Sequence, residues 1–134
     1  CWSASSPFMG MPAKEAAPHL PKPHRRRSPT PLVRLCYITA KDHTEAKLIS
    51  RHLLEEKLAA CVNIIPAIES LYWWEGKITE DHEALIIAKT NSRNVPALIK
   101  AVKSLHSYTV PCILSITIDE GNPDYVRWLQ QNLK

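Results

Sequence analysis

One long apolar hairpin constrains the fold more than any other feature of this sequence. Residues 60–74 and 78–90 read as two strands, and Glu75-Gly76 between them is a tight-turn signal. The pair is about thirty residues long, whereas a mean strand has about five or six. Pro66 falls inside the first strand, which indicates a bulge or a sheet edge. We therefore expect an antiparallel sheet with one hairpin that overhangs its surroundings.

Helix and strand signals flank the hairpin on both sides. In chain order, the sequence predicts a strand at 33–39, a helix at 42–57, the hairpin, a helix opened by Ser92 or Asn94, a strand at 112–118 and a helix from 122. Asp42 with Glu45 three residues later is a capping box, and Asn122-Pro123 is a further helix-start signal. The order β-α-β-β-α-β-α predicts an α+β, ferredoxin-like fold.

The second hairpin strand is apolar on both of its faces. Residues 84–88 read Ala-Leu-Ile-Ile-Ala, and successive side chains of a strand point to opposite faces. A sheet with helices on one face and water on the other should alternate apolar with polar residues. Trp73 and Trp74 near the hairpin tip are also costly to leave in water. We expect copies of the same chain to bury these surfaces; the alternative is that the last helix covers the second face.

The charge of the chain is unevenly distributed. The formal net charge of +4 lies wholly in residues 1–31, where Arg25, Arg26 and Arg27 stand among several prolines. We expect 1–31 to be a disordered leader and 32–134 to be the folded domain. Because the folded part is electrically balanced, it lacks the basic surface typical of nucleic-acid-binding proteins.

The cysteines indicate a reducing environment. Cys36, Cys61 and Cys112 stand alone in apolar strand-like contexts, with no C-x-x-C pair, which favours reduced, buried thiols. No run of eighteen apolar residues is present, so no transmembrane segment is predicted. A cytoplasmic location follows from both observations. Removal of an upstream targeting segment would instead be consistent with an organellar, secretory or membrane-associated protein.

Motifs spread over residues 33–134 resemble those of the CutA family of divalent-cation tolerance proteins. The matching residues are Ala59-Ala60-Cys61-Val62-Asn63, Tyr72-x-Trp74-x-Gly76, Glu83, Lys89-Thr90, His106-x-Tyr108, Pro111, Gly121, Tyr125 and Trp128. The chain is similar to an animal-type homologue or a CutA-like paralogue. The resemblance implies a ferredoxin-like homotrimer held together through its long hairpins, with copper binding as its biochemical property. For animal members it also implies a link with acetylcholinesterase maturation and membrane anchoring.

The chain departs from the family pattern at two positions. Ser107 stands where the family usually has proline, which loosens a rigid turn, and Cys112 stands where the family usually has an acidic residue. His106 and Cys112 suit copper or another divalent cation such as zinc, and Cys61, Glu83 or a neighbouring subunit would have to complete the site. The alternative is that His106 caps the preceding helix through its last carbonyls.

A second candidate site is a cleft between subunits. Its residues are Tyr72, Trp74, Glu83, Lys89, Tyr108 and Trp128. Glu83 and Lys89 share parity on one strand, so they face the same side but lie too far apart to touch. The alternatives are interface salt bridges for the charged pair and plain packing for the aromatic residues.

No catalytic motif is recognised, so we expect a binding protein without an organic cofactor and not an enzyme. The sequence has no G-x-S-x-G, no glycine-rich phosphate loop and no Cys-His signature. The first functional hypothesis is a trimeric copper-binding protein that acts in the response to metal ions. The second is a structural or adaptor trimer that helps a partner such as acetylcholinesterase to mature or reach the membrane. The third is a small-metabolite or nucleotide sensor that uses the intersubunit cleft.

Overall fold

The apolar strand after the hairpin turn lies inside a four-stranded antiparallel sheet. The computed structural model describes residues 31–134, so the predicted leader lies outside it except for Pro31. The strands are β1 (Val33–Ala40), β2 (Cys61–Trp74), β3 (Lys77–Asn91) and β4 (Ile113–Thr117). Their order across the sheet is β2-β3-β1-β4. This order, with the helices between the strands, confirms the ferredoxin-like fold.

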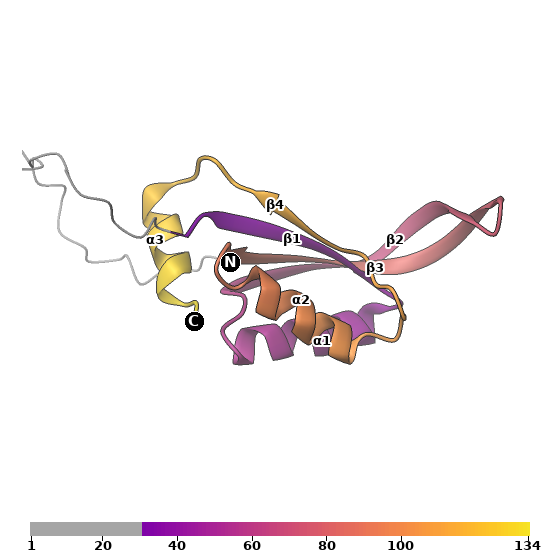
Figure 1. Cartoon of the computed structure of the whole chain (residues 1–134), viewed down its shortest axis with the longest axis horizontal. Coiled ribbons are helices and arrows are strands. Elements are labelled where there is room, and N and C mark those ends of the chain that lie inside the picture. The colour runs from indigo at the N-terminus through magenta and orange to yellow at the C-terminus, as the bar shows by residue number, and fades with distance from the viewer. Residues whose placement is uncertain (1–30) are drawn as a thin grey trace, which may run out of the picture.

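Two helices cover one face of the sheet and a third lies at one end (Figure 1). They are α1 (His43–Glu55), α2 (Val95–Leu105) and α3 (Pro123–Gln131). Asp42 caps α1 by accepting the Glu45 N–H at 2.8 Å, and Asn122 caps α3 by accepting the Asp124 N–H at 3.1 Å. Asn94, not Ser92, is the N-cap of α2, although its side chain makes no capping bond. None of these helices is long and apolar enough to cross a membrane.

The core lies between this helix layer and the sheet. Ile38 on β1 and Ile86 on β3 pair across the strands and are fully buried. Ile49 and Leu53 of α1, with Leu98 of α2, pack against them. Burial of each such side chain contributes about 1.5–3 kcal/mol, so this cluster holds α1 and α2 on the sheet.

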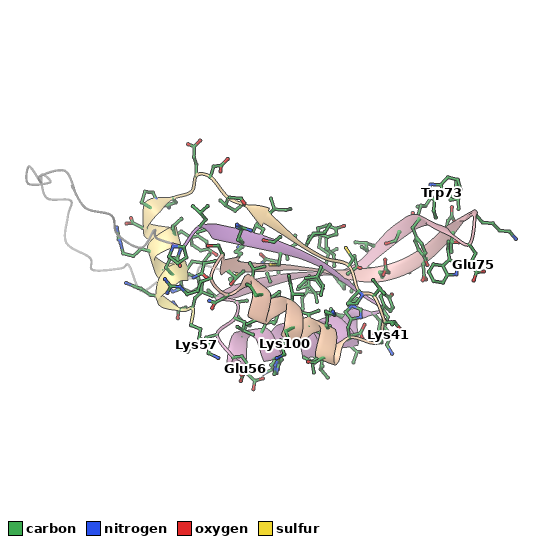
Figure 2. The ribbon with its side chains drawn as sticks, in the orientation of Figure 1. Lys41, Glu56, Lys57, Trp73, Glu75 and Lys100 are labelled. Atoms are coloured by element: carbon green, nitrogen blue, oxygen red, sulfur yellow. The ribbon has the colours of Figure 1, made fainter. Side chains whose placement is uncertain are left out.

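The hairpin extends well beyond the other strands. The last β1–β3 pair is Ala40 with Ala84, whereas β2 and β3 stay paired out to Trp74 and Lys77. The register shifts between Ile65 and Ile68, as the proline between them predicted. The turn takes positive φ at Glu75 (48°) and Gly76 (76°), which is the geometry of tight hairpin turns. Figure 2 shows Trp73 and Glu75 at the far end of this hairpin, away from the helices.

The second face of the sheet is apolar and largely uncovered. Tyr37, Ile65, Leu114 and Ile116 share the face of Leu85 and Ile87 through the strand register, and all four are exposed. We call these four exposed residues the open face. Leu114 is 60% exposed and, at the hairpin tip, Trp73 is 73% exposed. Helix α3 contacts this face at one end of β3, where Tyr125 and Gln130 bond to Lys89 and Asn91. The alternative that the last helix covers the whole face is therefore wrong.

The expectation for the cysteines is only partly met. Cys36 and Cys112 are free thiols, and Cys36 is fully buried. Burial raises the pKa of the Cys36 thiol, and the opposing effects of Ser115 and Arg34 are smaller. Cys61 is disulfide-bonded, so the prediction of a reduced thiol is wrong at this position.

Candidate functional site

The loop between α2 and β4 carries His106 into the interior at the base of the hairpin. The imidazole is 0% exposed, and its Nε2 lies 2.7 Å from the Thr39 carbonyl oxygen. Its Nδ1 accepts the Tyr108 N–H at 3.0 Å. An acceptor Nδ1 carries no proton, so Nε2–H donates to Thr39 and the ring is neutral. Both nitrogens of His106 are therefore occupied within the chain, and neither presents a lone pair to a metal.

Glu45 ties the start of α1 to this loop. Its carboxylate accepts the Lys41 N–H at 2.9 Å and the Ser107 N–H at 2.7 Å, and Oε2 lies 4.0 Å from His106 Nδ1. Burial by itself would raise the pKa of Glu45, but the hydrogen bonds from Lys41 and Ser107 outweigh it and lower the pKa. The ionised carboxylate is thus held in place. The bond from Ser107 needs a backbone N–H, which a proline at this position would not have.

Tyr108 joins the same loop to the hairpin. Its hydroxyl donates to Glu83 Oε2 at 2.9 Å, and its ring lies 4.7 Å from the His106 ring. Burial and the Glu83 carboxylate raise the pKa of Tyr108, so the phenol stays protonated and continues to donate. Desolvation, followed by the charges of Asp81 and Glu83, raises the pKa of Tyr72. Two of the predicted cleft residues, Glu83 and Tyr108, therefore share one region, which we call the hairpin base, whereas Tyr72 pairs with Thr79 towards the hairpin tip.

The other predicted cleft residues lie elsewhere in the chain. Lys89 is six positions from Glu83, about 20 Å at the usual rise of a strand. Its ammonium lies 3.1 Å from the Tyr125 hydroxyl and 5.3 Å from that ring, and Tyr125 stacks on Trp128 at 5.6 Å. Trp74 lies at the hairpin tip, paired with Lys77. The predicted cleft residues therefore lie in separate regions of one subunit. Tyr72, Trp74 and Trp128 do not form an aromatic pocket within one chain.

The predicted metal ligands are likewise divided. Cys112 lies near His106, because the Thr39 N–H donates to the Cys112 carbonyl at 3.4 Å while the Thr39 carbonyl accepts from His106. Cys61 starts β2, opposite Lys89, and its sulfur is in a disulfide. Within residues 31–134, no three His, Cys, Asp or Glu side chains gather as a metal site would require. Residues 31–134 of one subunit therefore do not fit a resident metal ion.

Sequence reasoning missed the role of Glu45 and the presence of Asp81 beside Tyr72. Glu45 carried a visible signal, its position three residues after an N-cap, and that signal predicted only a local capping role. The structure gives its side chain a bond to Ser107, sixty-two positions away. Nothing in the sequence indicated that bond, because it depends on how the loop packs against α1.

Comparison with known proteins identifies the protein family to which this chain is similar. The family model described as CutA1 divalent ion tolerance protein matches residues 34–132. The chain is 50% identical over 93 residues to "Protein CutA homolog" of Xenopus laevis, a match that covers 69% of this chain and 62% of that protein. It is 46% identical over 95 residues to "Divalent-cation tolerance protein CutA" of Thermus thermophilus, covering 71% and 92%.

A solved structure agrees with both the fold and the sequence match. The crystal structure of CutA1 from Oryza sativa superposes with a TM-score of 0.76 at 41% identity, and the match covers 78% of this chain and 96% of that one. The sequence motifs, the strand order and these matches agree over the same residues. The chain therefore belongs to the CutA1 divalent ion tolerance protein family.

Proposed function

We propose that this protein acts in tolerance to divalent cations as a binding protein that assembles from copies of itself, with a trimer as the expected assembly. The observation that carries the proposal is the open face, an apolar surface that a lone subunit leaves in contact with water. Contiguous apolar surface of this kind marks a protein interface. The description of the family and the name of the Thermus thermophilus relative mention tolerance to divalent cations and no catalysed reaction, which favours binding over catalysis.

Ligands for the cation then come from more than one subunit. Glu83 and Tyr108 of the hairpin base border the open face, so a neighbouring subunit that covers this face approaches them. Cys112 is partly exposed and free, and it offers a soft donor. Copper is the first ion to test, because thiolate and imidazole favour it. His106 joins such a site only if Tyr108 releases its N–H bond to Nδ1.

The experiment combines the native mass with a metal titration. The mass of the native particle in reduced protein is measured first, and copper is then titrated into the parent, Cys112→Ser, Glu83→Gln and His106→Ala. His43→Ala and His82→Ala are matched controls, because both histidines are exposed and neither is a proposed ligand. We expect a trimer whose copper binding weakens in Cys112→Ser and Glu83→Gln and is unchanged in the controls. Binding that is equal in all variants would show that these ligands are wrong.

A structural or adaptor function is the second candidate, and the hairpin tip favours it. Leu71, Trp73, Trp74 and Ile78 are all exposed there, far from the helix layer. If neighbouring subunits do not bury them, they form an apolar contact for another protein. Capture of a defined partner by a metal-insensitive trimer supports this function, and an acetylcholinesterase-associated complex is one partner to test. Thermal stabilisation by nucleotides, without any by metals, would instead favour the sensor hypothesis.

A further inference from the structure

An open groove runs along the outer side of α1, on the side of the sheet opposite to the open face. Its volume is about 510 Å³, and its lining residues are Lys47, Leu48, Arg51, His52, Glu55 and Leu105. The inner side of α1 buries Ala46, Ile49 and Leu53, whereas Leu48 points outward and is 55% exposed. The groove thus has leucines from α1 and from the end of α2 and is bordered by charged side chains.

The charges beside these leucines are mostly positive, and Lys47 and Arg51 make no ion pair among the described residues. Among residues 31–134, neither Lys47 nor Arg51 forms an ion pair or a side-chain hydrogen bond. Glu55 is the single acidic side chain of the lining. The neighbouring helix α2 adds Lys100 and Lys103 and contains no acidic residue. Figure 2 shows Lys100 on this helix layer. A partner with carboxylates on either side of an apolar stripe complements this pattern.

We propose that this groove binds an acidic amphipathic helix of a partner protein, whose apolar side chains contact Leu48 and Leu105 while its carboxylates pair with Lys47 and Arg51. Helix-in-groove recognition uses apolar anchors spaced i, i+3 or i+4, with charges at the rim that set specificity.

Two other occupants match the groove less well. Residues 1–31 of the same chain carry a net positive charge, the same sign as Lys47 and Arg51, so their charge does not complement the groove. A further copy of the chain is expected on the open face, across the sheet from α1 and α2 (Figure 1). Assembly through the open face therefore leaves the groove on the outside of the particle, accessible to a different protein.

The test uses the full chain and a fluorescent synthetic helix that carries a leucine stripe flanked by glutamates. One control peptide replaces the glutamates with lysines, and another replaces the leucines with serines. The protein variants are Leu48→Ser and the pair Lys47→Glu with Arg51→Glu. The pair Lys77→Glu with Arg93→Glu changes the net charge equally, and both residues are exposed outside α1, α2 and the groove lining. Fluorescence anisotropy at low salt measures binding, and the native mass of each variant is recorded.

We expect the acidic leucine peptide to bind the parent. Binding should weaken by about tenfold in Leu48→Ser and in the Lys47 and Arg51 pair, but by less than about twofold in the matched control. The absence of binding, equal binding of the lysine peptide, or no effect of Leu48→Ser would overturn the proposal. A changed native mass in the groove variants would show an interface between copies. If the protein binds phosphatidylserine vesicles and not the peptide, and Leu48→Ser does not change this binding, the groove is a lipid-binding surface. Either of these results would also refute it.

Discussion

Replacement of Glu45 by glutamine tests how the start of α1 is joined to the loop that carries His106. The carboxylate accepts two backbone N–H groups, from Lys41 and Ser107, at 2.9 and 2.7 Å. A hydrogen bond to a charged group contributes about 1.5–3 kcal/mol. Glutamine keeps one carbonyl oxygen and the same shape, so it can retain one of the two bonds. Because Lys41 and Ser107 are exposed, a released N–H finds water. We therefore expect Glu45→Gln to lose about 1–2 kcal/mol of unfolding free energy at pH 7.

The pH dependence of this loss gives the sharper test. The pKa of Glu45 in the folded protein lies below its ordinary value of 4.5. A carboxyl group with a lowered folded pKa stabilises the fold above its unfolded pKa, and this contribution is lost as the pH falls through the folded pKa. The parent should therefore lose stability below about pH 4.5 more steeply than Glu45→Gln. The difference between the two should shrink towards zero once Glu45 is protonated.

Urea unfolding followed by circular dichroism measures both quantities. All samples need the same protomer concentration, because the stability of an assembly depends on concentration. Glu55→Gln is the matched control, since it lies on the same helix but is exposed, and it should change stability by less than about 0.5 kcal/mol. The reasoning is refuted if Glu55→Gln costs as much as Glu45→Gln, or if the Glu45→Gln deficit is the same at pH 7 and pH 3.

Four further substitutions probe the fold and the open face. Leu114→Lys should leave the subunit folded, because this residue is 60% exposed within one chain, but it should lower the native mass; an unchanged mass at micromolar concentration would place the interface elsewhere. Ile86→Ala, at a fully buried position, should reduce the unfolding free energy by about 2–5 kcal/mol in urea titration. Gly76→Ala should reduce it by about 1 kcal/mol, because φ is +76° although no atom lies within 4 Å of the added methyl group. Tyr108→Phe removes the bond to Glu83 and should reduce the unfolding free energy by about 1 kcal/mol in the same urea titration.

Local sequence signals predicted most of the secondary structure correctly. The hairpin, its tight turn at Glu75-Gly76 and the irregularity beside Pro66 are where the sequence placed them. The caps at Asp42 and Asn122 are also confirmed. These signals depend on the backbone preferences and side chains of a few neighbouring residues. The end of the first helix was predicted less well: α1 ends at Glu55, two residues before the predicted end at 57. Lys57 itself takes a positive φ, which is incompatible with a continuing helix.

The candidate site was predicted less well, because it depends on contacts between distant segments. The sequence identified His106 as a chemical group but not the two bonds that occupy both of its nitrogens. It grouped Glu83 with Lys89 by parity, and the structure places them on one face with separate partners, Tyr108 and Tyr125. Odd or even position along a strand predicts which face of the sheet a side chain is on. It does not predict which loop packs on that face, because that loop comes from a distant part of the chain.

The sequence alone determined the order of the elements, the ferredoxin-like sheet and the apolar character of both faces of β3. Each of these follows from periodicity, capping residues and turn residues within short stretches. Only the tertiary structure decided that Ser107 donates to Glu45, that His106, Tyr108 and Glu83 are linked by hydrogen bonds at the hairpin base, and that α3 leaves most of the open face uncovered. The physical reason is that hydrogen bonds and burial depend on distances between atoms that the chain brings together only when it folds.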